Sequence, residues 1–135
     1  MKELTLEATV ENLEKVLGFV EEQLEANGCP MKVLMQVQIA VEEIYVNIAH
    51  YAYQTETGIV TICVRVGGDP VQVTITFIDR GIPYDPLARE DPDTTLSAEK
   101  RKIGGLGIFM VKKSMDDMKY EYSQGQNILT IRKSL

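Results

Sequence analysis

Two segments of alternating hydrophobic and polar residues, joined by a turn, limit most strongly what this chain can fold into. Hydrophobic residues occupy every second position through much of residues 59–66 and again in residues 71–78. Between the two segments lies Gly67-Gly68-Asp69-Pro70, which is rich in turn-forming residues. A period of two is typical of strands that bury one face. We therefore expect an antiparallel hairpin within a sheet that has one buried face.

Asp79 continues the hydrophobic side of the second segment. The residues that share one face of the expected strand are Val71, Val73, Ile75 and Phe77, and Asp79 is next in the same alternation. A buried, ionised carboxylate is costly unless hydrogen-bond donors face it. Two explanations are open at this point. Backbone N–H groups in the turn at Gly81 satisfy the carboxylate, or the carboxylate holds a ligand amino group at the end of the sheet.

A second pair of polar residues lies on an expected helix. Hydrophobic residues recur there at helical spacing: Val37, Val41, Ile44 and Ile48. Glu43 and Asn47 are four positions apart, so they lie on one edge of the helix beside its apolar face, whereas Glu42 points away. A carboxylate and an amide in this position can hold a hydrated magnesium ion or place a base beside a phosphate. They can also be ordinary polar residues at the boundary of the core.

The remaining pattern predicts further strands and helices around the hairpin. Because hairpins dominate, we expect an α+β fold, namely a two-layer sandwich with a mostly antiparallel or mixed sheet and the helices on one face. This arrangement differs from a doubly wound nucleotide-binding fold. The other expected elements are a strand at 3–8, a helix at 10–24, the helix from Met31 to Tyr53, a helix after Gly107 and a closing hairpin of residues 118–123 and 128–133 around a loop at 124–127.

Residues 80–102 lose this periodicity and form an expected long loop, of a length that is often functional. The loop ends at Ile103-Gly104-Gly105-Leu106-Gly107, after which helical spacing resumes. Backbone N–H groups in a glycine cluster at a helix start can converge on a phosphate, although glycines also simply end loops. The cluster lacks the lysine and the serine or threonine of a P-loop.

Composition excludes several classes of protein. A chain of 135 residues is expected to form a single domain, residues 1–135. Its net charge of −6 argues against a general nucleic-acid or anionic-membrane surface. The hydrophobic runs are too short to span a bilayer and no signal segment is visible, so we expect a cytoplasmic protein. Cys29 and Cys63 lack metal-type spacing and are expected to be free thiols.

Three separated motifs carry a family resemblance: Glu43-x-x-x-Asn47, then Asp79-Arg80-Gly81-Ile82-Pro83-Tyr84-Asp85, then Gly104-Gly105-Leu106-Gly107. In this order they resemble the nucleotide-binding boxes of the GHKL ATPase superfamily, over nearly the whole chain. Within it, the chain is similar to the anti-sigma-factor serine/threonine kinases of bacterial partner-switching systems. The resemblance implies the histidine-kinase-like (Bergerat) fold, binding of ATP and Mg²⁺, and an ATP lid at about residues 80–103.

The resemblance also implies a role for each motif residue. Asn47 would hold magnesium that bridges the ATP phosphates, and Glu43 would activate the attacking hydroxyl. Asp79 would accept a hydrogen bond from the adenine amino group, and Gly81 would let the backbone pass close to adenine. Thr130, on the last strand, would be a polar residue near adenine. The residues expected near the phosphates are Gly104, Gly105, Leu106 and Gly107.

The implied activity is transfer of the ATP γ-phosphate to a serine or threonine of an anti-anti-sigma (STAS-type) protein. A sigma factor would be the second partner, and related kinases often work as dimers. One alternative is an ATP-dependent module that sequesters a partner without phosphorylating it, which the presence of both Glu43 and Asn47 disfavours. Another is a detached histidine-kinase catalytic domain, which the additional amino-terminal strand, the long first helix and the lack of a phosphoacceptor region disfavour.

Overall fold

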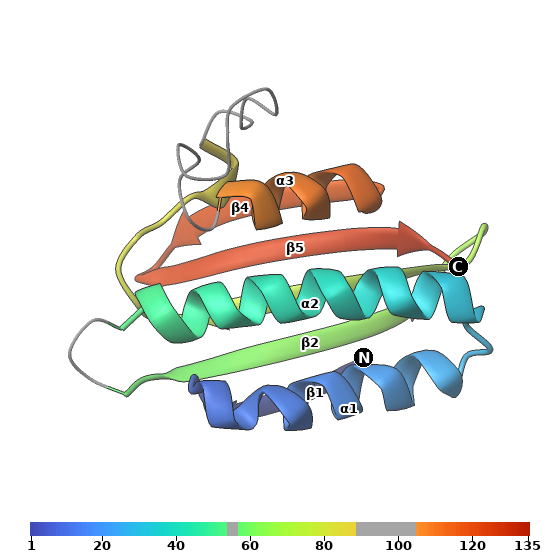
Figure 1. Cartoon of the computed structure of the whole chain (residues 1–135), viewed down its shortest axis with the longest axis horizontal. Coiled ribbons are helices and arrows are strands. Elements are labelled where there is room, and N and C mark those ends of the chain that lie inside the picture. Colours follow the sequence, from blue (N-terminus) through green and yellow to red (C-terminus); the bar gives the residue numbers. More distant parts are fainter. Residues whose placement is uncertain (54–56, 89–104) are drawn as a thin grey trace.

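A computed structural model describes residues 1–53, 57–88 and 105–135. Within this part, five strands form one sheet in the order β1-β2-β3-β5-β4, with every pairing antiparallel. The three α-helices of this part lie together on one face of the sheet (Figure 1). The expected two-layer α+β architecture is therefore confirmed. The elements are β1 (Lys2–Glu7), α1 (Leu13–Glu25), α2 (Met31–Tyr51), β2 (Ile59–Gly67), β3 (Gln72–Asp79), α3 (Gly105–Ser114), β4 (Asp117–Ser123) and β5 (Gln126–Ser134), with short 3₁₀ turns at Val10–Asn12 and Pro86–Ala88.

The turn between α1 and α2 determines where α2 begins. The N–H of Cys29 donates to Leu24 O and the N–H of Gly28 donates to Glu25 O, both at 3.1 Å. Gly28 has a φ of +68°, a left-handed conformation that glycine adopts without steric cost. Pro30 then caps α2 in an extended conformation. These constraints start α2 at Met31, as the sequence predicts.

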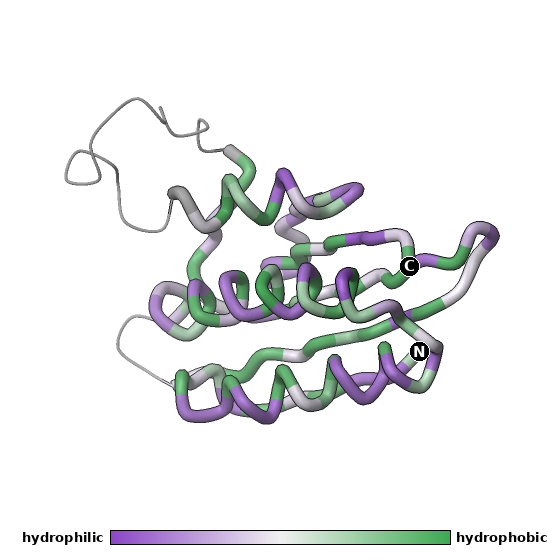
Figure 2. Tube along the Cα trace, turned by 45° about the vertical axis from the view of Figure 1, so that its right-hand side comes forward, coloured by the Kyte–Doolittle hydropathy of each residue, from purple (hydrophilic) through white to green (hydrophobic). Residues whose placement is uncertain are grey.

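α2 crosses the middle of the sheet between α1 and α3 (Figure 1). Hydrophobic and hydrophilic residues alternate along the helices, as expected for helices with one buried face (Figure 2). Each fully buried aliphatic side chain contributes about 1.5–3 kcal/mol relative to an exposed one. The buried α2 residues are Leu34, Val37, Ala40, Val41, Ile44 and Tyr45, and the sheet residues of the same core include Ile62, Ile75, Phe77 and Ile131.

β3 lies between β2 and β5 and shows the predicted alternation over its whole length. Val73, Ile75 and Phe77 are buried, and the residues between them are partly exposed. Asp79 keeps the parity of the buried residues and is only 5% exposed. The strand therefore carries a carboxylate into the helix-covered side of the sheet at its C-terminal end.

The closing hairpin is tighter than expected. Residues 124–127 were predicted to form its loop, but the turn consists only of Gln124 and Gly125, with φ of 53° and 77°. Ser123 and Gln126 already pair across the hairpin. Two successive residues with positive φ are sufficient to connect two antiparallel strands in a hairpin. The loop assignment of Asn127 is therefore wrong, and this residue lies inside β5 opposite Asp79.

No helix in the described residues is long and apolar enough to cross a membrane. Cys29 and Cys63 are free thiols, and Cys63 is buried. Burial raises the pKa of both thiols.

Candidate functional site

A pocket opens at the end of β3, between the sheet, the C-terminal half of α2 and the first turns of α3. Most of its walls are aliphatic or aromatic, and the polar side chains are few. A concave apolar site with a few convergent polar groups is typical of small-molecule binding. The lining residues are Ile44, Asn47, Ile48, Tyr51, Ala52, Phe77, Asp79, Ile82, Tyr84, Pro86, Ile108, Tyr120, Asn127 and Leu129.

Asp79 places a hydrogen-bond acceptor at the buried end of this pocket. Its Oδ1 accepts hydrogen bonds from the N–H of Gly81 at 2.8 Å and from Asn127 Nδ2 at 2.9 Å. Its Oδ2 accepts none from the described residues. The turn amide expected from the sequence is therefore present, and it accounts for one oxygen only. The other explanation, a ligand amino group held by this carboxylate, stays a prediction.

Asn127 is the site residue that the sequence did not reveal. It is only 6% exposed, and its Nδ2 also donates to Ile82 O at 2.9 Å. Its Oδ1 accepts from the N–H of Tyr84 at 3.2 Å and from the hydroxyl of Tyr120. Asn127 thus connects Asp79, the segment after β3 and β4. The signal that could have revealed it is the two-residue turn, because a strand from residue 126 onward puts Asn127 on the buried side.

Gly81 lets the chain leaving β3 pass close to the end of α2. A Cβ on Gly81 would lie 2.2 Å from the carbonyl oxygen of Ala52 and 2.7 Å from its Cα. The N–H of Ile82 donates to that same oxygen at 2.9 Å. Packing against α2 is thus sufficient to require glycine here. An approach of this backbone to adenine stays a prediction.

Glu43 and Asn47 are half-buried on one edge of α2, and Glu42 is exposed, as expected. Asn47 lines the pocket. Glu43 reaches the start of α3, where a Cβ on Gly107 would lie 2.0 Å from Glu43 Oε1. Burial, together with repulsion from Glu42, raises the pKa of the Glu43 carboxyl. A carboxylate with a raised pKa is a stronger base, so this position suits proton transfer.

The structure describes only part of the motif Gly104-Gly105-Leu106-Gly107. Gly105, Leu106 and Gly107 form the first turn of α3, and Gly104 lies outside the described residues. The first N–H groups of a helix have no partners within the helix and can bind a phosphate. Of the expected lid at 80–103, residues 80–88 are described and residues 89–103 are not.

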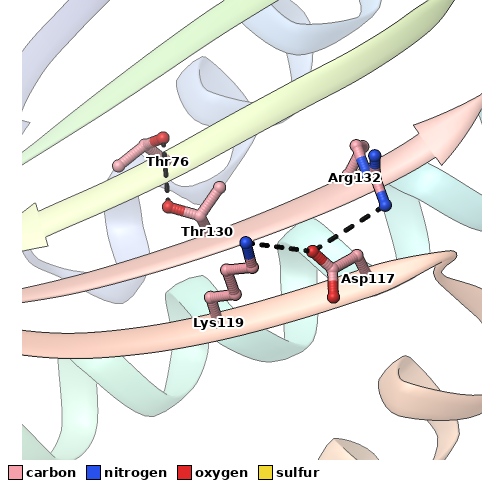
Figure 3. Close-up of polar contacts among 5 residues, drawn as sticks. All are labelled: Thr76, Asp117, Lys119, Thr130 and Arg132. Carbon is pink, nitrogen blue, oxygen red and sulfur yellow. Dashed lines mark hydrogen bonds and ion pairs between the residues drawn. The ribbon is translucent and has the colours of Figure 1, made fainter.

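Thr130 is not brought to the pocket. It lies on the uncovered face of β5, and its Oγ1 is 3.4 Å from Oγ1 of Thr76 (Figure 3). The β5 residues that line the pocket are Asn127 and Leu129. Thr130 does not line this pocket, because the strand alternation turns its side chain to the other face. Its predicted position near adenine stays a prediction. The same uncovered face carries the ion pairs of Asp117 with Lys119 and Arg132 (Figure 3).

Comparison with known protein families matches residues 6–133 to the histidine kinase-like ATPase domain. One relative is the serine-protein kinase RsbW of Listeria monocytogenes, 29% identical over 107 residues, which are 76% of this chain and 67% of the relative. Another is the anti-sigma F factor of Clostridium acetobutylicum, 27% identical over 97 residues, which are 72% of this chain and 66% of the relative. The chain thus spans about two thirds of the length of these relatives.

Solved structures show the same fold at lower identity. The structure of the RsbU and RsbW domains of a Mycobacterium tuberculosis protein has a TM-score of 0.67 at 18% identity, over 100% of this chain and 33% of that chain. The SiaB–SiaC complex from Pseudomonas aeruginosa has a TM-score of 0.57 at 15% identity, over 98% of this chain and 89% of that chain. Because of these low identities, the likeness concerns the fold alone.

Proposed function

The chain belongs to the histidine kinase-like ATPase domain family, and on this basis we propose that it is an ATP-dependent serine/threonine protein kinase that acts as an anti-sigma regulatory factor. The observation that carries the proposal is the arrangement around the pocket. A buried acceptor, Asp79, lies at one end, Asn47 lies at the rim, and Glu43 lies against the start of α3. A nucleotide base, its phosphates and an attacking hydroxyl need these groups in this order.

Adenine is the base that fits the buried end of the pocket. Oδ2 of Asp79 accepts a hydrogen bond from the exocyclic amino group, since Oδ1 is already occupied by two donors. The flat faces of the base pack against aliphatic and aromatic walls, among them Ile44, Phe77 and Leu129. The pocket thus supplies both the apolar contact area and the single polar group that orients the ligand.

Asn47 is suited to hold Mg²⁺ beside the phosphates. Its side chain is half-buried at the pocket rim and makes no hydrogen bond with other described residues, so its amide oxygen is available as a ligand. Mg²⁺ in phosphoryl-transfer sites takes few protein ligands and completes its shell with phosphate oxygens and water. When bound, the ion supplies charge neutralisation at the phosphates.

Glu43 acts as the general base of the transfer. Its carboxylate takes the proton of a serine or threonine hydroxyl while that oxygen forms a bond to the γ-phosphorus of ATP. The bond from the γ-phosphorus to the β,γ-bridging oxygen breaks, and ADP leaves. Catalysis of this reaction depends mainly on positioning and on stabilising charge. The N–H groups at the start of α3, which include that of Gly107, supply part of this stabilisation.

The substrate in this proposal is a STAS-type anti-anti-sigma protein, and a sigma factor is the second partner. The names of the relatives, serine-protein kinase and anti-sigma F factor, support both assignments. The whole of residues 1–135 forms the kinase domain, and its lid includes residues 80–103. We further propose that the protein works in the cytoplasm, as a homodimer, without binding nucleic acid or membranes.

The decisive test is incubation with γ-labelled ATP and candidate STAS proteins. Acid-stable phosphoserine or phosphothreonine on the partner is expected, and Glu43→Gln serves as the matched variant. Stable complex formation that depends on ATP but transfers no label would instead establish a sequestering module. Acid-labile label on histidine would establish histidine-kinase chemistry.

A further inference from the structure

We propose that Asn127 is a positioning residue for adenine recognition. It holds Asp79 so that Oδ2 faces the nucleotide, and it thereby sets the preference for ATP over nucleotides with a 6-oxo purine. The inference rests on the proposed ATP site. It adds a residue of β5 to a site whose recognised motifs lie on α2, at the end of β3 and at the start of α3.

The orientation of the Asn127 amide follows from its backbone neighbours. The N–H of Tyr84 can only donate, so the Asn127 atom 3.2 Å from it is the oxygen. The carbonyl of Ile82 can only accept, so the atom 2.9 Å from it is the nitrogen. A flipped amide would break both bonds. The nitrogen therefore always points toward Oδ1 of Asp79.

This orientation determines which carboxylate oxygen a ligand meets. Oδ1 of Asp79 receives hydrogen bonds from Asn127 and from Gly81, and these occupy both of its usual acceptor positions. Two bonds to one oxygen also restrict rotation of the carboxylate. An adenine amino group then donates to Oδ2. The oxygen of a 6-oxo purine would bring an acceptor against an acceptor, so it loses a hydrogen bond and leaves both groups unsatisfied.

The same amide positions one wall of the pocket. It binds the segment after β3 through the carbonyl of Ile82 and the N–H of Tyr84, and both of these residues line the pocket. A loss of this wall alone would weaken binding of all purine triphosphates alike. A loss of Asp79 orientation would change the ratio of affinities for ATP and inosine triphosphate. This ratio separates positioning from a merely structural role.

The first test is Asn127→Asp, with the affinities for ATP and inosine triphosphate measured by titration between pH 5 and 8. At pH 8 the introduced carboxylate faces Oδ1 of Asp79 with no proton between them, and the ATP preference is expected to fall about tenfold or more. On acidification the protonated carboxyl can donate to Asp79 as the amide does, so the preference recovers. The other titratable groups around the Tyr120–Asn127 pair are Tyr120 itself, Asp85 and Tyr122, and all are unchanged in the variant.

The second variant is Asn127→Leu, which has no donor at any pH and is expected to lose the preference without recovery. Ile128→Val changes the same strand on its uncovered face and is the matched control, with an unchanged ratio expected. If Asn127→Leu does not fold, the ATP preference of Asn127→Asp, compared between pH 8 and pH 5, still tests the inference.

Two results would overturn the inference and leave the kinase proposal standing. The first is an Asn127→Asp variant whose ratio of affinities for ATP and inosine triphosphate equals that of the wild-type protein at every pH. The second is equal affinity of the wild-type protein for both nucleotides. A wild-type protein that binds neither nucleotide would overturn the ATP site itself, and this inference with it.

Discussion

The two faces of the sheet carry similar polar groups in very different surroundings. On the helix-covered face, Asp79 and Asn127 are both buried, and Asn127 Nδ2 donates a hydrogen bond to Asp79 Oδ1. On the uncovered face, Asp117 pairs with Lys119 at 3.9 Å and with Arg132 at 3.8 Å, and these side chains are 37–78% exposed. Exposed ion pairs contribute about 0–1 kcal/mol, whereas a buried group left without its partner costs about 1–3 kcal/mol.

This difference shows where polar residues carry information about function. Asp117 and Lys119 have exposed side chains that water can satisfy, so their presence requires no ligand. Asp79 occupies a position where a hydrophobic residue would be more stable, and one of its oxygens has no partner among the described residues. Substitutions on the two faces therefore provide a direct test of the contrast.

Glu43→Gln is expected to have the largest effect. Without a general base, phosphorylation of the partner should fall by about 10²–10⁴-fold. ATP affinity should change little, because Glu43 does not line the pocket. Single-turnover transfer of label, with ATP affinity measured separately, checks both statements. Full transfer activity in this variant would remove Glu43 from the mechanism.

The raised pKa of the Glu43 carboxyl affects how activity and stability depend on pH. Transfer needs the ionised carboxylate, so wild-type activity should fall on acidification at a higher pH than for an ordinary glutamate. Because the folded state binds this proton more tightly than the unfolded state, ionisation of Glu43 lowers stability as the pH rises above its unfolded pKa. Glu43→Gln should therefore melt at or above the wild-type temperature at neutral pH. A lower melting temperature would contradict this sign.

Asp79→Asn is expected to weaken ATP binding by about 10–100-fold, as for a lost hydrogen bond that leaves its partner unpaired. Gly81 and Asn127 both require an acceptor at this position, so the new NH₂ group must face the adenine amino group. Isothermal titration with ATP measures the loss. The matched change on the uncovered face is Asp117→Asn, for which wild-type affinity is expected.

Gly81→Ala tests the close passage of the chain past α2. A methyl group here meets backbone atoms of Ala52, which cannot move away as a flexible side chain can. Overpacking of this kind costs about 1–3 kcal/mol. Thermal unfolding should show the loss of stability, and Gly67→Ala, where the added Cβ meets nothing within 4 Å, is the control. Equal melting temperatures for the two variants would show that the passage is not tight.

Thr130→Val is expected to have the smallest effect. Its partner Thr76 is 3.4 Å away on a partly exposed surface, so the free energy of unfolding should change by no more than about 0.5 kcal/mol. ATP affinity should stay within about twofold of wild type. A strong loss of ATP affinity would show that Thr130 contributes to ATP binding, and thus that residues of both faces of the sheet affect it.

Residue periodicity was sufficient to predict most of this fold. The alternation in β3 placed Asp79 on the buried face, and the helical spacing in α2 separated Glu43 and Asn47 from the exposed Glu42. Both predictions hold because hydrophobic residues that face the core recur at a regular spacing in the sequence. The convergence of the two elements at one pocket depends on tertiary packing, which periodicity alone does not contain.

The last hairpin shows where this reasoning failed. Residues 124–127, three polar residues and one glycine, suggest a loop, and their composition does not distinguish a two-residue turn from a four-residue one. Asn127 was missed for this reason. Thr130 was assigned by resemblance against the alternation of Leu129 and Ile131, and the alternation is what the structure follows.

The turn at Gln124 and Gly125 has a consequence far from its own position. Its two residues fix which side chains of β5 face the helices, and a shift of the strand by one residue exchanges the two sets. A single inserted residue there would turn Thr130 toward the helix-covered face and Asn127 toward water. The chemistry of base recognition thus depends partly on the length of a surface turn whose own residues, Gln124 and Gly125, do not line the pocket.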